Sequence, residues 1–216
     1  MLRVDRKSSL DSNISRWLSK SIRHVSDKLN LTLDAYGRVP MQELVEALNT
    51  LLGQKILESF GHLVTESEVI AVIDAQDPEN LRHSWVCVEG KILVSCFQGH
   101  AAKFYEPYGP IKFDCIWEEI TTPIKAFHNT KAEFLESILL KGLMFTNPLL
   151  KPTGEAGRFV HMYNADSEKK GRLHSTATVE VDMGRAMANG VRFFMAGNGV
   201  IIATEPVPAD CLSVVG

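Results

Sequence analysis

An arginine and a histidine stand side by side in the sequence, as Arg23 and His24. A guanidinium binds phosphate oxygens through two parallel hydrogen bonds and keeps its charge at physiological pH. A neighbouring imidazole adds a second contact, whose charge changes near neutrality. The pair is therefore a candidate phosphate-binding site. The alternative is a solvated surface on which Arg23 forms a salt bridge with Asp27, and the residue types alone leave both open.

A helix over residues 12–29 is expected to carry this pair. Its apolar residues recur at intervals of three and four, which is the period of a helix with one buried face. Lys20 stands about one turn before Arg23 and is a candidate contact to an RNA phosphate, or else a solvated side chain. We expect Trp17 in the core rather than as a platform for base stacking. The buried face consists of Ile14, Trp17, Leu18, Ile22 and Val25.

The following segments predict the elements around this helix. A short extended segment precedes Pro40, which suits the first turn of a second helix. Residues 65–68, Thr-Glu-Ser-Glu, form a capping-box pattern that starts a third helix. Apolar runs at 85–88 and 92–97 are joined by a Glu-Gly turn and predict a hairpin. Helix, strand, two helices and a hairpin is the order of a winged helix, a fold that binds either nucleic acid or protein.

The second half predicts short strands, few helices and irregular connections, which indicates the α+β class. Residues 144–157 contain two prolines and two glycines and are expected to form an exposed loop. We expect a flexible arm at 1–11, a first lobe at 12–106 and a second lobe at 111–216. Strands are predicted at 124–128, 159–163, 176–182, 191–194 and 200–203, and helices at 131–141 and 183–189.

Composition and charge limit the binding partners and the cellular location that can be expected. The net charge of −3 argues against a surface covered in basic residues. Up to Arg38, however, eight lysines and arginines stand against four aspartates, which favours an anionic partner for this part. The four cysteines form no CxxC pair, so we expect free thiols and no metal site. No apolar run reaches about 18 residues, and no secretory signal is evident. The expected location is the cytoplasm, with the nucleus as a second possibility, and no membrane.

Several short motifs, taken in order, resemble the NAD-dependent RNA 2′-phosphotransferases that finish tRNA splicing. The resemblance runs from about Ile14 to Leu212. The family's opening helix ends in Leu-Arg-His, which resembles Ile22-Arg-His24 of this sequence. The matching segments are Leu18-Ser-Lys-Ser-Ile-Arg-His24, Leu31-Thr-Leu-Asp-Ala-Tyr-Gly-Arg-Val39, Gln98-Gly-His100, His128-Asn-Thr130, Val160-His-Met162, Ala186-Met-Ala-Asn-Gly-Val-Arg-Phe-Phe194 and Asn198-Gly-Val-Ile-Ile202.

The resemblance implies an N-terminal winged-helix lobe and a C-terminal lobe similar to ADP-ribosyltransferases. It also implies the reaction, in which an RNA 2′-phosphate is transferred to NAD. The products are repaired RNA, ADP-ribose cyclic phosphate and nicotinamide. The implied partners are NAD as co-substrate and RNA, with tRNA as the natural substrate, and the implied protein is a monomer.

The resemblance assigns roles to individual residues, and two positions depart from the family pattern. Ser95 and Gly157 stand where the family has arginines, with Arg158 one step from the second position. Two alternatives follow: a diverged relative that ADP-ribosylates terminal phosphates of nucleic acids, or a non-catalytic protein that binds RNA or NAD. The implied catalytic residues are Arg23, His24 and Arg158; the NAD-binding residues are His128, Asn129, Thr130, His161 and Asn198; the RNA-binding residues are Lys20 and His100.

Overall fold

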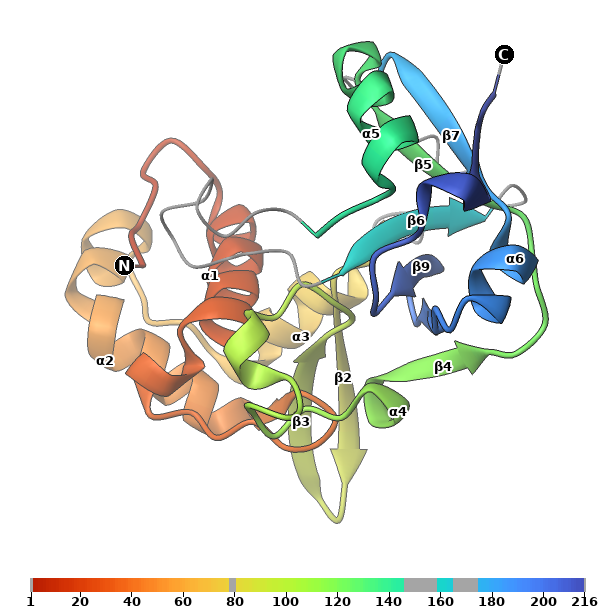
Figure 1. The fold of residues 1–216 in the computed structure, drawn as a ribbon. Coiled ribbons are helices and arrows are strands. Elements are labelled where there is room, and N and C mark those ends of the chain that lie inside the picture. The colour runs from red at the N-terminus through yellow and green to blue at the C-terminus, as the bar shows by residue number, and fades with distance from the viewer. Residues whose placement is uncertain (1, 78–80, 146–158, 165–174, 216) are drawn as a thin grey trace. The chain divides into compact units, whose positions relative to one another are not determined.

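The structure is a computed structural model that describes residues 2–77, 81–145, 159–164 and 175–215 (Figure 1). Contacts divide the chain into two compact units, Met1–Ile116 (unit 1) and Trp117–Gly216 (unit 2). This division comes later than the expected boundary at 106–111. Ile111 is fully buried, and its N–H donates to the carbonyl of Phe104 in unit 1.

Unit 1 combines helices with a three-stranded antiparallel sheet of order β1-β3-β2. The order of helix, strand, two helices and hairpin confirms the order expected from the sequence. The first helix ends at His24, earlier than expected, and a separate 3₁₀ turn follows it. The elements are α1 (Leu10–His24), η1 (Ser26–Leu29), β1 (Arg38–Pro40), α2 (Met41–Phe60), α3 (Glu66–Asp74), β2 (His83–Val88), β3 (Lys91–Cys96), η3 (Ala102–Phe104) and α4 (Phe113–Ile116).

Local sequence explains the ends of these helices. The Thr65 hydroxyl accepts from the Glu68 N–H, and the Glu68 carboxylate accepts from the Thr65 N–H, which confirms the predicted capping box. Helix α2 ends at Phe60 and is capped by Gly61, whose φ of 82° is disfavoured for residues with a side chain. The core between the helices and the sheet contains fully buried apolar residues from each: Ile14, Leu18, Ile22, Leu44, Leu48, Ile56 and Val94.

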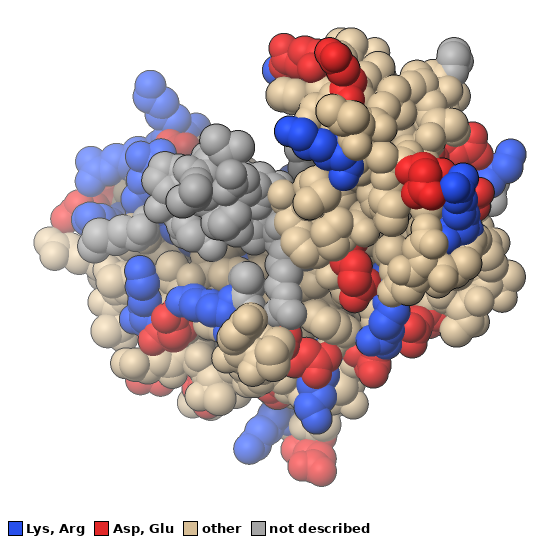
Figure 2. Space-filling model, in the orientation of Figure 1, with Lys and Arg blue, Asp and Glu red and all other residues tan. Residues whose placement is uncertain are grey.

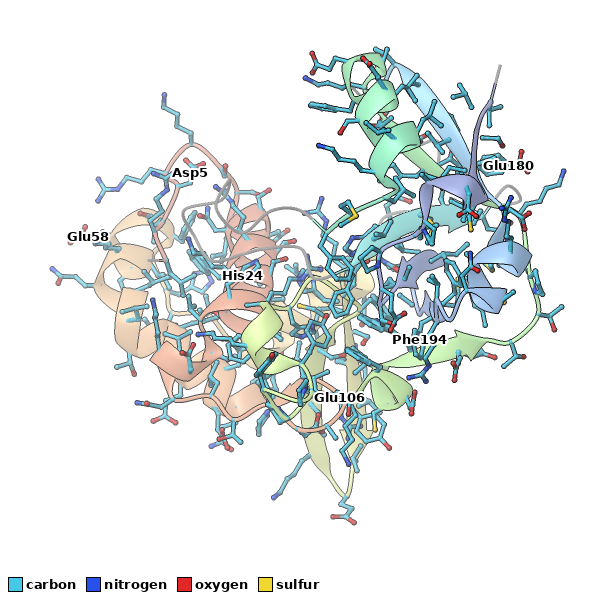
Figure 3. All side chains as sticks on the ribbon, in the orientation of Figure 1. Asp5, His24, Glu58, Glu106, Glu180 and Phe194 are labelled. Atoms are coloured by element: carbon cyan, nitrogen blue, oxygen red, sulfur yellow. The ribbon has the colours of Figure 1, made fainter. Side chains whose placement is uncertain are left out.

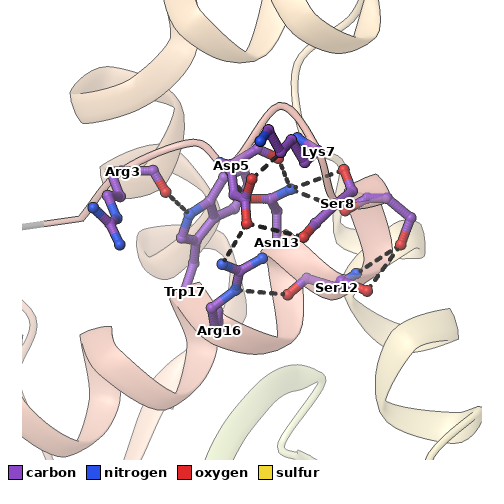
Figure 4. Close-up of polar contacts among 9 residues, drawn as sticks. Arg3, Asp5, Lys7, Ser8, Ser12, Asn13, Arg16 and Trp17 are labelled. Carbon is purple, nitrogen blue, oxygen red and sulfur yellow. Dashed lines mark hydrogen bonds and ion pairs between the residues drawn. The ribbon is translucent and has the colours of Figure 1, made fainter.

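The residues before α1, where the sequence predicts a flexible arm, form hydrogen bonds with the helix (Figure 4). Asn13 is fully buried, and its amide nitrogen donates to the carbonyls of Asp5, Ser8 and Ser9. Its amide oxygen accepts from the Asp5 N–H at 2.8 Å. Trp17 is buried, as predicted, and its indole N–H donates to the carbonyl of Arg3 at 2.9 Å.

Unit 2 is built on a seven-stranded antiparallel sheet of order β10-β7-β5-β6-β9-β8-β4. Short helices flank it, and the mixture of helices with antiparallel sheets is compatible with the α+β class. Strands β4 and β10 have no counterpart among the predicted strands. The elements are β4 (Trp117–Ile120), β5 (Ala126–Thr130), η4 (Ala132–Phe134), α5 (Leu135–Lys141), β6 (Val160–Asn164), β7 (Ala177–Val181), α6 (Met183–Ala188), β8 (Phe193–Ala196), β9 (Val200–Ala203), η6 (Ala209–Cys211) and β10 (Leu212–Val214).

One face of this sheet forms the core of unit 2. Ala126, Phe193 and Ile201 are fully buried there, together with Met183 of α6. The expected loop at 144–157 lies mostly outside the described residues. Among the helices that the structure describes, none has the length and apolarity needed to cross a bilayer.

Candidate functional site

Arg23 lies in the last turn of α1, where the carbonyl end of the helix stabilises a cation. Its Nη2 donates to the carbonyl of Arg82 at 3.3 Å, and its own carbonyl accepts from the Ala101 N–H at 2.7 Å. The expected alternative, a salt bridge with Asp27, is not formed, because Asp27 pairs with Lys103 at 2.6 Å. Within the described part of the chain, the Arg23 guanidinium has no carboxylate partner.

The backbone at Arg82 is held in place by Gln76, two residues after the end of α3. The Gln76 side-chain oxygen accepts from the N–H groups of Arg82 and His83, at 2.8 and 3.0 Å. Its side-chain nitrogen donates to the carbonyls of Ile73 and His83. The start of β2, and with it the acceptor for Arg23, is therefore fixed by three hydrogen bonds from one amide, and the fourth bond joins that amide to α3.

Two buried histidines, His83 and His100, are neutral neighbours of Arg23. Burial, the larger cause, and the charge of Arg23 together lower the pKa of each to about 3. Nε2 of His83 lies 2.9 Å from the Ser19 hydroxyl. The Tyr105 ring stands edge-on to His100, with its hydroxyl 3.5 Å from Nδ1. Neither ring carries charge near pH 7, so the positive charge beside them belongs to the arginine.

The remaining predicted phosphate- and RNA-binding residues differ from one another in their burial. His24 is half-buried at the end of α1 (Figure 3), and Lys20 is half-buried on the same helix. His100 is only 6% exposed, so its predicted role as an RNA contact is not supported by its position. Its ring instead packs inside unit 1. Arg158 lies outside the described residues.

Ser95, where an arginine is expected from the resemblance, lies in β3 opposite Ser84 and Arg38. Its hydroxyl is 2.8 Å from that of Ser84. Arg38 is the nearest cation across the β1–β3 ladder, but its Nε donates to Asp34 at 2.7 Å and its guanidinium stacks on Tyr36. Arg38 is thus already engaged by a carboxylate.

The candidate NAD-binding residues of unit 2 lie on neighbouring strands but on both faces of the sheet. Strand β5 pairs with β6 at Ala126 and Phe127, whereas its pairing with β7 covers all five of its residues. Beyond Phe127, the backbone pairing with β6 stops, and the His128 side chain forms the next link between the two strands. Its Nδ1 donates to the carbonyl of His161 at 3.0 Å. A carbonyl accepts only, so Nδ1 carries the proton, and Nε2 is the acceptor of the neutral ring.

Asn129 and His161 share the face opposite the core. The Asn129 side-chain oxygen accepts from the hydroxyls of Tyr163 and Thr178, at 2.8 and 2.9 Å. Strand alternation puts His128 and Thr130 on the other face, that of Ala126. Asn198 lies in the turn between β8 and β9, where its side-chain oxygen accepts from the Val200 N–H at 3.3 Å. The structure therefore brings Asn129 and His161 together and separates Thr130 from them.

Three residues with a positioning role, His83, Gln76 and Asn13, were not predicted from the sequence. His83 precedes the predicted start of the strand at residue 85 by two positions, so the alternation of the hairpin extended backwards would have placed it on a strand face. Gln76 and Asn13 gave no comparable signal, because their hydrogen bonds join segments whose approach is set by the fold.

Known proteins match nearly the whole chain. Residues 9–205 match the model of the family described as RNA 2′-phosphotransferase, Tpt1 / KptA. A "probable RNA 2′-phosphotransferase" of Acaryochloris marina is 28% identical over 201 residues, covering 91% of this chain and 93% of the relative. A protein of the same name from Agrobacterium fabrum is 29% identical over 204 residues, covering 93% and 92%. One from Hyperthermus butylicus is 26% identical over 204 residues, covering 93% and 78%. The chain belongs to the RNA 2′-phosphotransferase family, a family of transferases.

Proposed function

We propose that this protein removes an internal 2′-phosphate from RNA by transferring it to NAD, with tRNA splice junctions as the natural source. The products are repaired RNA, ADP-ribose cyclic phosphate and nicotinamide. Beside the family, the observation that supports this most is the Arg23 guanidinium, fixed by a carbonyl and free of any described carboxylate. A guanidinium without a carboxylate partner can accept an anionic ligand such as a phosphate.

The surroundings of Arg23 suit the binding of a phosphate. Its charge is permanent, and its planar group matches two phosphate oxygens. The neutral rings of His83 and His100 lower the local polarity without adding a competing charge. Electrostatic attraction is stronger in such surroundings than in water. His24, next in sequence, is proposed to contact the same phosphate.

The element order of unit 1 supports its assignment as a winged-helix, RNA-binding lobe. Basic side chains gather around its N-terminal end (Figure 2), where Arg3, Lys7 and Arg16 are exposed. Phosphate contacts of this kind position an RNA without reading its sequence.

Unit 2 is proposed to be the lobe similar to ADP-ribosyltransferases, which binds NAD. The two hydroxyls that hold the Asn129 oxygen fix its amide orientation, and its Nδ2 donates to no residue that the structure describes. Asn129 and His161 would hold NAD on their shared face, while His128 fixes the backbone at His161. NAD supplies the electrophilic ribose carbon and nicotinamide as the leaving group.

A short RNA with one internal 2′-phosphate tests the proposal. The phosphate should be lost only when NAD is added, with one nicotinamide released for each phosphate removed. The matched RNA without the 2′-phosphate should release none. Stable attachment of label from NAD to the RNA would instead indicate the ADP-ribosylating alternative. No NAD-dependent change at high protein concentration would contradict both.

A further inference from the structure

Arg82 combines a fixed backbone with a side chain that forms no hydrogen bond or ion pair with a described partner. Its N–H donates to Gln76, and its carbonyl accepts from the Phe97 N–H at 3.2 Å as well as from Arg23. The residue is exposed, and no hydrogen bond or ion pair joins its guanidinium to the described residues. An arginine held this way is available to a ligand.

The guanidinium charges of Arg82 and Arg23 both act on the His83 ring. After burial, the charges of both arginines are the causes that lower the pKa of His83 to about 3. Each cation therefore lies close enough to the His83 ring to oppose its protonation. The bond from Arg23 Nη2 to the Arg82 carbonyl also ties α1 to the start of β2.

The strand register shows which surface the Arg82 side chain can reach. The bond from Phe97 to Arg82 continues the β2–β3 ladder one step beyond the pair of His83 and Cys96. Arg82 is then two residues from Ser84, which faces Ser95. Residues diagonal to each other on one face of a ladder are about 7–8 Å apart, within reach of a long side chain. Arg82 can thus place its charge over Ser95, which has none.

We propose that Arg82 is a second phosphate ligand and forms, with Arg23, a two-arginine site for the 2′-phosphate of the RNA. This inference rests on the proposed function and identifies a residue for it. A phosphate monoester carries a charge of about −1.5 to −2 at neutral pH, and two guanidinium groups balance this charge. The two arginines approach from separate elements, so the site forms only when α1 and β2 are correctly packed.

The test measures binding without NAD, so that no turnover is needed. Fluorescence anisotropy gives the Kd of an RNA with an internal 2′-phosphate and of the same RNA without it. The ratio of the two values is the preference for the phosphate. Loss of a hydrogen bond to a charged group should reduce this preference about ten- to hundredfold in Arg82→Ala. Arg82→Lys, which keeps the charge but not the planar fork, should lose less.

Lys91→Ala is the matched control. Lys91 is also exposed, it lies opposite Val88 at the other end of the β2–β3 ladder, and no hydrogen bond or ion pair joins its side chain to the described residues. The preference of this variant for the phosphate should stay within about twofold of the wild type.

The outcomes separate the two proposals. A wild-type protein with no preference for the phosphate would contradict the proposed function itself. A wild-type preference that survives in Arg82→Ala, or an equal loss of affinity for both RNAs, would contradict the role of Arg82 and leave the proposed function standing. Circular dichroism confirms folding, and Arg82→Lys decides the question if the alanine variant unfolds.

Discussion

Replacement of Gly99 by alanine is expected to slow phosphate transfer far more than it destabilises the fold. Gly99 has a φ of 82°, so an alanine there is strained by about 1–2 kcal/mol. A methyl group built on it would lie 3.4 Å from Nη1 of Arg23 and 3.6 Å from its Cδ and Cζ. These are ordinary contact distances, so the methyl group fits, but it covers one side of the guanidinium.

The magnitude follows from the contact that the methyl group blocks. A phosphate oxygen must come within about 2.7–2.9 Å of a guanidinium nitrogen. One lost hydrogen bond to a charged group is worth about 1.5–3 kcal/mol. In kcat/KM this corresponds to a decrease of roughly ten- to 150-fold.

Gly61→Ala is the matched control. Gly61 also has a φ of 82°, but a methyl group there meets no atom within 4 Å. Urea unfolding should show similar losses of stability for both variants, whereas 2′-phosphate transfer with NAD should fall only in Gly99→Ala. Equal kcat/KM values for the two variants would refute the reasoning that phosphate approaches Arg23 from the side of Gly99.

Three further predictions concern activity, pH and the N-terminal segment. Arg23→Ala should reduce kcat/KM about 10²–10³-fold and, through the lost bond to Arg82, stability by about 1.5 kcal/mol; an unfolded variant would show that Arg23 is mainly structural. His83 and His100 have a folded pKa of about 3, below the value of about 6.5 in the unfolded chain. Unfolding therefore takes up protons below pH 6.5, and each histidine should lower the free energy of unfolding by about 1.4 kcal/mol per pH unit as the pH falls toward 3. Urea titrations at pH 7 and 5 measure this, and a pH-independent stability would contradict it. Asn13→Ala removes four hydrogen bonds at a buried site and should destabilise by about 3 kcal/mol or more in urea unfolding, against a negligible change for the exposed Gln54→Ala.

Local patterns predicted the elements of unit 1 well. The buried stripe of α1, the capping box at Thr65 and the hairpin all depend on residues within a few positions of one another. The predicted end of the first helix was wrong because apolar periodicity continues to Leu29. The backbone leaves helical geometry at Val25, whose φ is −134°, and resumes as a 3₁₀ turn. Periodicity cannot distinguish these two helical forms over a single turn.

The candidate site could be predicted only where its residues are close to one another in the sequence. Arg23 and His24 are consecutive in the sequence, so their proximity could be predicted without knowledge of the fold. The burial of His100 depends on packing against Tyr105 and Gly37, which no pattern near Gln98 encodes. The arrangement of the candidate NAD-binding residues could not be predicted, because the register between strands decides the face on which each side chain lies.

The hydrogen bonds at both ends of α1 have a consequence for its local opening. Asn13 and Trp17 attach the segment around Arg3 and Asp5 to the start of the helix, and the Arg23 carbonyl attaches its end to Ala101. Helix ends usually fray, and their amides exchange with solvent through small openings. Because both ends of α1 are held by these bonds, its amides should exchange only when the helix separates from its unit as a whole. Hydrogen–deuterium exchange should therefore show slow, uniform protection along α1, reaching the turn that carries Arg23.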